Sequence, residues 1–182
     1  MSLHSGGLTL FYTNTIHIIS FSMIRQDIQK ITALKGLGNE HLKVLLPLFS
    51  PCYFQPMKVV FAQNSPAEFL YFLSEGQVAL SFIPYDAAST RMAKINAGDV
   101  FGWSAVLGRG SYSMTATTLE ECVSFRIKSK DLYNLCQNCP ETGIMVIENL
   151  AGAITDPYQS TRSFIYSILK RSMGIEEFYT TG

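Results

Sequence analysis

Residues 96–107 read Asn-Ala-Gly-Asp-Val-Phe-Gly-Trp-Ser-Ala-Val-Leu, and this stretch decides the fold. Gly98 and Asp99 form a turn signal, two β-prone residues follow, and Gly102 then breaks the chain again. Residues 97–99 therefore predict a turn between two β-prone runs.

Short β-prone runs, separated by Gly, Pro, Asn and Asp, lie on both sides of this stretch. They cover residues 58–61, 69–73, 77–83, 91–95, 113–118 and 122–127. In one of them Val78, Leu80 and Phe82 alternate onto a single face, as in an antiparallel strand. Runs at this spacing, with no long helix between them, predict a mainly β protein, either a sandwich or a jelly roll, rather than a parallel sheet.

Helical patterns flank the predicted roll. Before it, Ile24, Ile28 and Ile31 recur at helical spacing, and a second helix follows in which Asn39 is the expected N-cap and Pro51 the end. The expected apolar face of that second helix is Leu42, Leu45, Leu46 and Phe49.

After the roll we expect a short helix over residues 131–136 and a second helix with Pro140 in its first turn. Its apolar stripe is Ile144, Ile147, Leu150, Ala151 and Ile154. Asp156 and Pro157 then predict the start of a further, long C-terminal helix that runs to about Arg171.

Two more stretches join residues 96–107 in a common pattern. Residues 60–72 contain a turn at Asn64, a residue type that tolerates left-handed backbone, and residues 73–78 read Leu-Ser-Glu-Gly-Gln-Val. In this order and spacing the three stretches resemble the cyclic-nucleotide-binding domain of the catabolite-activator type, over about residues 23–154. The resemblance implies a jelly roll, or double-stranded β-helix, that senses a small ligand and has no enzymatic activity.

The resemblance also implies a phosphate-binding cassette, a glycine-hinged helical turn over residues 101–107 whose free N–H groups point at the ligand. The family has a Glu after this glycine to hold the ribose and an Arg later in the loop to clamp the phosphate. Here Trp103 stands at the Glu position and Tyr112 or Ser113 stands opposite the Arg, with Arg109 close by. The expected ligand-binding residues are Phe101, Gly102, Trp103, Ser104, Ala105, Arg109, Tyr112, Ser113, Met114 and Thr115.

These replacements remove charge-assisted hydrogen bonds worth ~1.5–3 kcal/mol each, which weakens cyclic nucleotide binding by roughly 10²-fold or more. Cyclic AMP or cyclic GMP is therefore not firmly implied as the ligand. Trp103 and Tyr112 favour a flatter or less charged molecule. The alternative hypothesis is a ligand-free interaction or dimerisation protein whose pocket is vestigial.

Other classes of protein are disfavoured by residue placement. A cupin-like metalloenzyme, the third hypothesis, needs histidines inside the roll, but His4, His17 and His41 all precede it. Cys136 and Cys139 have the spacing of a redox pair or half a metal site, although only Cys52 and Cys122 remain as further ligands. The net charge of zero disfavours direct nucleic-acid binding.

Composition and length predict the organisation and the partners. Of the 182 residues, 47% are hydrophobic and 15% charged, and no apolar run is long enough for a membrane span, so we expect a cytoplasmic protein. We expect residues 1–22 to be an extension that begins like an expression-tag remnant, residues 23–155 the sensor domain, and residues 156–182 a helix and tail. A homodimer through the C-terminal helices, where Gly143, Ala151 and Gly152 permit close approach, and an effector protein are the expected partners besides the ligand.

Overall fold

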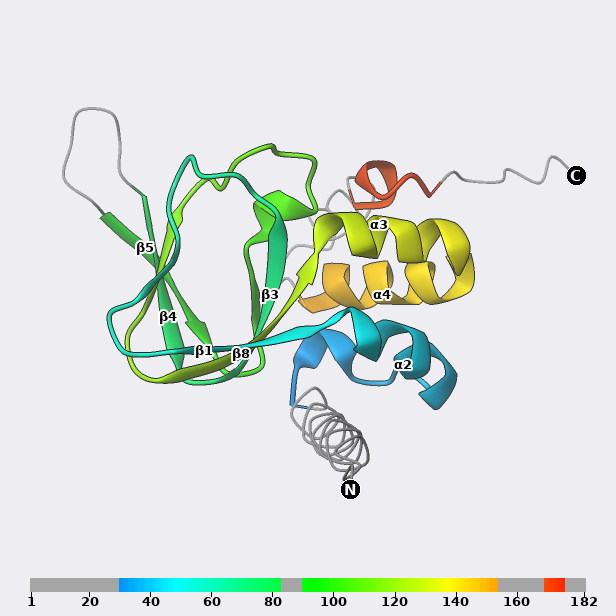
Figure 1. Ribbon diagram of the computed structural model, residues 1–182, viewed down its shortest axis with the longest axis horizontal. Coiled ribbons are helices and arrows are strands. Elements are labelled where there is room, and N and C mark those ends of the chain that lie inside the picture. The colour runs from blue at the N-terminus through cyan, green and yellow to red at the C-terminus, as the bar shows by residue number, and fades with distance from the viewer. Residues whose placement is uncertain (1–29, 83–89, 154–168, 176–182) are drawn as a thin grey trace, which may run out of the picture.

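The computed structural model describes residues 30–82, 90–153 and 169–175. Figure 1 shows a β-roll on one side of the molecule and a layer of helices on the other. The predicted helix before Ile31, the turn at residues 84–89 and most of the predicted helix from Asp156 to Arg171 lie outside the described residues.

Within the described residues, eight antiparallel strands form two four-stranded sheets, which confirms the predicted jelly roll. The first sheet contains, in spatial order, β1 (Ser50–Phe54), β8 (Cys122–Lys128), β3 (Phe69–Glu75) and β6 (Val100–Phe101). The second sheet contains, in spatial order, β2 (Val59–Phe61), β7 (Thr115–Thr118), β4 (Gln77–Phe82) and β5 (Thr90–Asn96).

Two strands differ from the sequence-based expectation. Pro51 does not end a helix but lies within β1, which is tolerated because β1 is an edge strand and pairs only with β8. In β4, Val78 and Leu80 contact the roll interior as predicted, whereas Phe82 is exposed. The register of β4 against β5 shifts between Leu80 and Ser81, and this irregularity breaks the alternation.

Helices cover one end of the roll. They are η1 (Thr32–Leu34), α2 (Asn39–Leu45), η2 (Leu46–Leu48), α3 (Ser129–Asn138) and α4 (Pro140–Ala153), with the short turn η3 (Trp103–Ala105) inside the roll segment. Asn39 is the first residue of α2 and Gly38 is its N-cap, so the predicted cap was displaced by one residue. Pro140 begins α4 as predicted, and α3 is longer than predicted at both ends.

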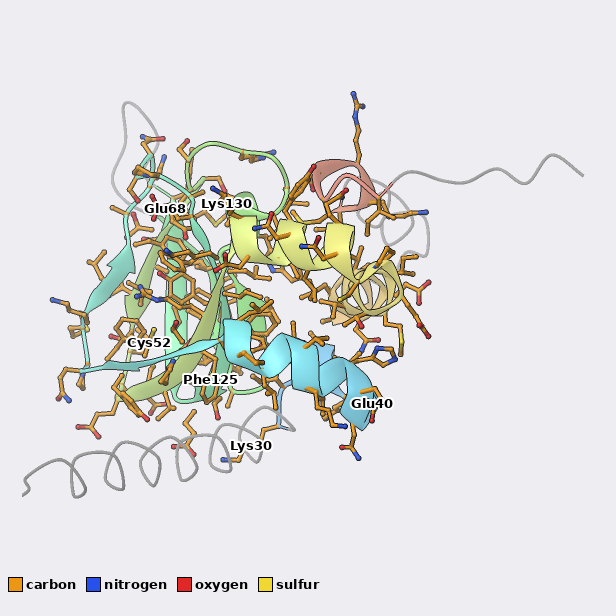
Figure 2. The ribbon with its side chains drawn as sticks, turned by 45° about the vertical axis from the view of Figure 1, so that its right-hand side comes forward. Lys30, Glu40, Cys52, Glu68, Phe125 and Lys130 are labelled. Carbon is orange, nitrogen blue, oxygen red and sulfur yellow. The ribbon has the colours of Figure 1, made fainter. Side chains whose placement is uncertain are left out.

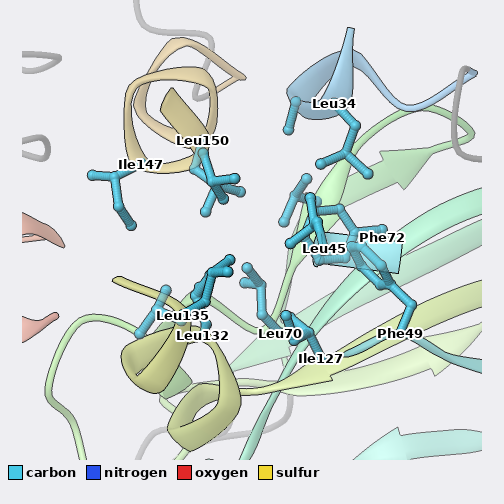
Figure 3. Close-up of a cluster of buried hydrophobic side chains, with 14 of the residues drawn as sticks. Leu34, Leu45, Phe49, Leu70, Phe72, Ile127, Leu132, Leu135, Ile147 and Leu150 are labelled. Carbon is cyan, nitrogen blue, oxygen red and sulfur yellow. The ribbon is translucent and has the colours of Figure 1, made fainter. Parts of the chain in front are cut away.

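Alternate residues of β3 face two separate apolar cores. Leu70 and Phe72 pack into the cluster between the sheet and the helices, which Figure 3 shows together with the helix residues that contact them. Tyr71 and Leu73 point the other way, into the interior of the roll. The predicted face of α2 and η2 is buried in the helix-side cluster, as are Ile147, Leu150 and Ala151 of α4.

Helices α3 and α4 pack closely because Gly143 has no side chain. A Cβ atom at this glycine would lie 2.7 Å from the Cα atom of Cys136. The sequence analysis assigned Gly143 to a contact between two copies of the chain, but here it serves a contact within one chain. None of the helices among the described residues is long and apolar enough to cross a membrane.

Candidate functional site

The turn that follows β6 depends on the backbone freedom of Gly102. Its φ angle is +82°, a left-handed value that residues with a Cβ atom rarely adopt. A Cβ atom there would also lie 3.0 Å from the carbonyl oxygen of Phe69 and 3.2 Å from Cδ2 of Tyr71. The glycine therefore brings the start of η3 directly against β3, as the predicted glycine-hinged turn requires.

Hydrogen bonds within the turn leave two backbone donors unused. The N–H of Ala105 donates to the carbonyl of Gly102 at 3.1 Å, and the N–H groups of Val106 and Leu107 donate to that of Trp103 at 3.0 and 3.1 Å. The N–H groups of Trp103 and Ser104 make no hydrogen bond within the part of the chain that the structure describes. Unused donors at the start of a helical turn suit an anion or a carbonyl oxygen.

Trp103 does not line the roll interior. Its Nε1–H donates to the carbonyl of Val100 at 3.0 Å, and its indole packs against the helix-side cluster. Ser104 is buried and holds the following loop, because its Oγ accepts the N–H of Ser113 at 3.2 Å and its carbonyl accepts the N–H of Arg109 at 3.3 Å. The Arg109 side chain is exposed on this loop.

Tyr112 points into the roll. Its ring stacks on Phe61 with centroids 3.8 Å apart and planes 12° apart, and only 3% of the residue is exposed. Its hydroxyl donates to the carbonyl of Phe69 at 2.7 Å and accepts the N–H of Phe69 at 3.0 Å. Ser113, the other residue considered opposite the family's Arg, is exposed. A neutral phenol of this chain thus occupies the interior beside the turn.

Further aromatic rings pack beside Tyr112 in the roll interior. The rings of Tyr71 and Phe101 stack with centroids 5.0 Å apart, and Phe61 lies 6.0 Å from Phe101. Of the remaining predicted residues, Ala105 is buried, Met114 is half-buried, and Thr115 accepts the N–H of Gln63 at its Oγ1, 2.9 Å away. The structure therefore brings Phe101, Gly102 and Tyr112 together, whereas Trp103 packs on the helix side, Arg109 is exposed and Thr115 bonds to Gln63.

The sequence analysis missed Phe61, Tyr71 and Arg126. On β8, Cys122, Ser124 and Arg126 alternate with residues of the helix-side cluster and face the roll. The guanidinium carbon of Arg126 lies 4.2 Å from the centroid of the Phe69 ring. The alternation of residues 122–127, which had already predicted a strand, could have assigned this arginine to the inner face.

Burial controls the protonation of the tyrosines in the roll. It raises the pKa of Tyr112 to about 12, although the hydrogen bond from the hydroxyl to the Phe69 carbonyl acts in the opposite direction. Burial also raises the pKa of Tyr71, against the effect of the neighbouring Arg126 guanidinium. Both hydroxyls are therefore neutral donors at neutral pH, and neither supplies a negative charge to balance Arg126.

The thiols do not form a redox or metal site in the described part of the chain. All four cysteines are free, and burial raises the pKa of Cys136 to about 11, which makes its thiol a weak nucleophile. The described residues contain no cluster of three or more His, Cys, Asp or Glu residues suited to a metal ion. Of the histidines, His41 is described, and its Nδ1 lies 2.9 Å from Oγ1 of Thr142, between α2 and α4.

The comparisons with known proteins agree with the fold described above. The cyclic nucleotide-binding domain family matches residues 51–139. A cyclic nucleotide-binding domain from Methylobacillus flagellatus KT superposes with a TM-score of 0.65 at 18% identity, covering 81% of each chain. A mutant regulatory subunit of a cAMP-independent protein kinase A from Trypanosoma brucei, with cAMP in its A site, superposes with a TM-score of 0.62 at 19% identity, covering 81% of this chain and 52% of that one.

In sequence, this chain is 25% identical to Potassium channel AKT2 of Oryza sativa subsp. japonica over 122 residues. The match covers 67% of this chain but only 14% of the channel, so it concerns one domain of a much longer protein. Residues 51–139 thus match the model of the cyclic nucleotide-binding domain family, in agreement with the resemblance found in the sequence.

Proposed function

We propose that this chain is a regulatory domain that binds a small ligand between the turn at residues 101–107 and the aromatic rings of the roll. The pair of unused N–H groups at Trp103 and Ser104, next to an aromatic interior, carries this proposal. The Tyr112 ring occupies the interior, and a ligand enters by displacing it. No catalytic step is proposed.

Cyclic nucleotides are expected to bind more weakly than in the family. Trp103 offers no carboxylate to a ribose, and its indole faces the helices. Tyr112 or Ser113 offers a neutral hydroxyl where the family has a cation, and Arg109 is exposed on the loop. The Trypanosoma neighbour, a regulatory subunit of a cAMP-independent kinase, supports the use of this fold for regulation without cAMP.

The C-terminal segment is the proposed route of the signal. The Ser172 hydroxyl donates a hydrogen bond to the carbonyl of Val106, at the end of the turn. Leu169 and Met173 are buried in the helix-side cluster, and the Gln137 side chain donates to the carbonyl of Met173 at 2.9 Å. A shift of the turn on ligand binding therefore moves residues 169–175, which pass it to an effector protein or a second copy of the chain.

A thermal-shift panel tests the proposal. Cyclic nucleotides, other nucleotides and aromatic acids are added to the wild-type protein, to Tyr112→Ala, and to Tyr53→Ala as a control at an exposed tyrosine on β1. A ligand at about 100 times its dissociation constant adds roughly 2.7 kcal/mol of apparent stability. We expect at least one compound to stabilise the wild type, and Tyr112→Ala to bind it more tightly because the ring no longer has to be displaced.

The second candidate function is a ligand-free interaction module. The observation that favours it is the tight filling of the interior, where Tyr112 is stacked at 3.8 Å and doubly hydrogen-bonded. Under this hypothesis the panel is flat for the wild type and for Tyr112→Ala alike. That result would contradict the sensor proposal, because the alanine variant keeps the turn and removes the ring that fills the interior.

A further inference from the structure

Arg126 places a cation on the inner face of the roll. It lies on β8 and pairs with Tyr71 of the neighbouring β3. Arg126 is partly buried, and its guanidinium lies over the Phe69 ring. Its Nε atom is buried and has no hydrogen-bond partner among the described residues. The same guanidinium interacts with the Tyr71 hydroxyl and with the Cys52 thiol, neither of which is an acid at neutral pH.

No carboxylate of the described residues neutralises this cation. The ion pairs of Lys30 with Glu75 and of Lys43 with Glu40 are exposed, and neither includes Arg126. A cation held at a partly buried position without an opposite charge, and with one N–H left unsatisfied, costs free energy. An anion that enters the roll would supply both the missing charge and the missing acceptor.

Arg126 lies in line with the proposed ligand site. Across the sheet Tyr71 pairs with Arg126 on one side and with Phe101 on the other. Adjacent strands are about 4.8 Å apart, so the backbone positions of Arg126 and Phe101 are about 10 Å apart. Gly102 follows Phe101 directly. A single small molecule about 10 Å long can therefore contact the Arg126 guanidinium, the Tyr71 ring and the start of the turn after Phe101.

We propose that Arg126 binds the anionic group of the ligand, a carboxylate or a phosphate, while the organic part of the ligand lies along the rings of Tyr71 and Phe61. This inference rests on the proposed function and gives it a ligand class and an anion-binding residue on β8, outside the loop at residues 102–115. A planar guanidinium binds either oxyanion through two parallel hydrogen bonds.

The experiment follows the Nε–H resonance of Arg126 in proton–nitrogen NMR spectra of the full chain. Inorganic phosphate and benzoate are titrated separately, because they carry the two kinds of anion. We expect a saturable shift of this resonance with at least one of them. The probe that binds more tightly identifies the anion as a phosphate or as a carboxylate on an aromatic body.

Variants then test the residue. Arg126→Gln is expected to weaken binding of the probe by ~10-fold or more, as for loss of a charge-assisted hydrogen bond, and Arg126→Lys by less. Lys94→Gln removes one positive charge from an exposed site on β5 and is expected to leave the affinity unchanged. If Arg126→Gln does not fold, Arg126→Lys decides, since an affinity equal to that of the wild type overturns the inference.

Two other results also overturn it. One is the absence of a saturable shift with either anion, and the other is equal affinity of the wild type and Arg126→Gln. Both leave the regulatory proposal standing, provided that a compound of the thermal-shift panel stabilises the wild type and Arg126→Gln equally. A panel that is flat for the wild type and for Tyr112→Ala, by contrast, rejects the regulatory proposal itself.

Discussion

The Tyr112 hydroxyl donates a hydrogen bond to the Phe69 carbonyl at 2.7 Å and accepts one from the Phe69 N–H at 3.0 Å. A Tyr112→Phe substitution keeps the ring stack on Phe61 and removes both bonds, so the Phe69 N–H and carbonyl lose their shared partner. We expect the free energy of unfolding to fall by about 1–3 kcal/mol, measured by urea denaturation at pH 7. Tyr53→Phe, at an exposed hydroxyl, is the control.

The same variant is expected to alter the alkaline unfolding of the protein. The pKa of Tyr112 is raised from 10.0 to about 12 in the folded chain. Between these two values the unfolded chain releases the proton while the folded chain keeps it, so stability falls as the pH rises. Tyr112→Phe lacks this contribution and should lose stability less steeply from pH 10 upwards. Equal slopes for the two proteins would contradict the buried position of the hydroxyl.

Gly110 is a matched control position for a substitution at Gly102. A Gly102→Ala variant forces a Cβ into left-handed backbone and within 3.0 Å of the Phe69 carbonyl, so we expect a loss of about 1–3 kcal/mol in the free energy of unfolding. A Cβ at Gly110 meets nothing within 4 Å, and Gly110→Ala should change stability by less than about 1 kcal/mol. Similar losses in the two variants would show that the turn does not need its glycine.

Among the elements, the contact between the C-terminal segment and η3 can be tested separately. Ser172→Ala removes the hydrogen bond to the Val106 carbonyl, and we expect the free energy of unfolding to fall by about 0.5–1.5 kcal/mol. The emission of Trp103, the single tryptophan of the chain, reports the transition because its indole packs in the same cluster. Ser111→Ala, at an exposed serine, should have no effect.

Most elements could be predicted from sequence because their patterns are local. The strands β2, β3, β4, β5, β7 and β8 match β-prone runs bounded by turn residues, and Asn64 has the expected positive φ of 67°. Strand β1 was missed because Pro51 is normally a strand breaker and only its edge position makes it acceptable. Strand β6 has two residues, too few for a periodic pattern.

Only the backbone of the site, and not the direction of its side chains, could be predicted from the sequence. The motif around Gly102 located the turn correctly, since glycine at a left-handed position has a local signature. The direction of the Trp103 and Tyr112 side chains could not be predicted, because it depends on packing between residues far apart in sequence. Tyr112 meets Phe61 from β2 and Phe69 from β3, and neither pairing follows from spacing along the chain.

At the scale of the whole molecule, the roll and the helices form two layers, and β3 contributes side chains both to the core inside the roll and to the core under the helices. Cys52 and Glu68 mark the roll side in Figure 2, and Glu40 marks the helix side. The helix-side cluster includes Leu169 and Met173 from the C-terminal segment and Leu34 from η1. Segments from both ends of the described chain therefore meet in one apolar core.

The homodimer stays a prediction. Of the three small residues assigned to its seam, Gly143 packs on Cys136 and Ala151 is buried, so Gly152 is the one that remains exposed on α4. We expect sedimentation of the full chain at high micromolar concentration to show a dimer, and Gly152→Glu to shift it towards monomer by placing a charge at the seam. A monomer for the unsubstituted chain at that concentration would refute the dimer.

The bond between the Phe69 N–H and the Tyr112 phenol gives the protein a built-in reporter. This amide is shielded by a side chain rather than by a neighbouring strand, so its deuterium uptake follows the residence of that one ring inside the roll. A compound that expels the ring and leaves the amide uncovered speeds the uptake at Phe69 and not at Phe72. A compound that binds elsewhere slows both or neither. Occupancy of the interior is thus readable from a single backbone proton, without label or mutation.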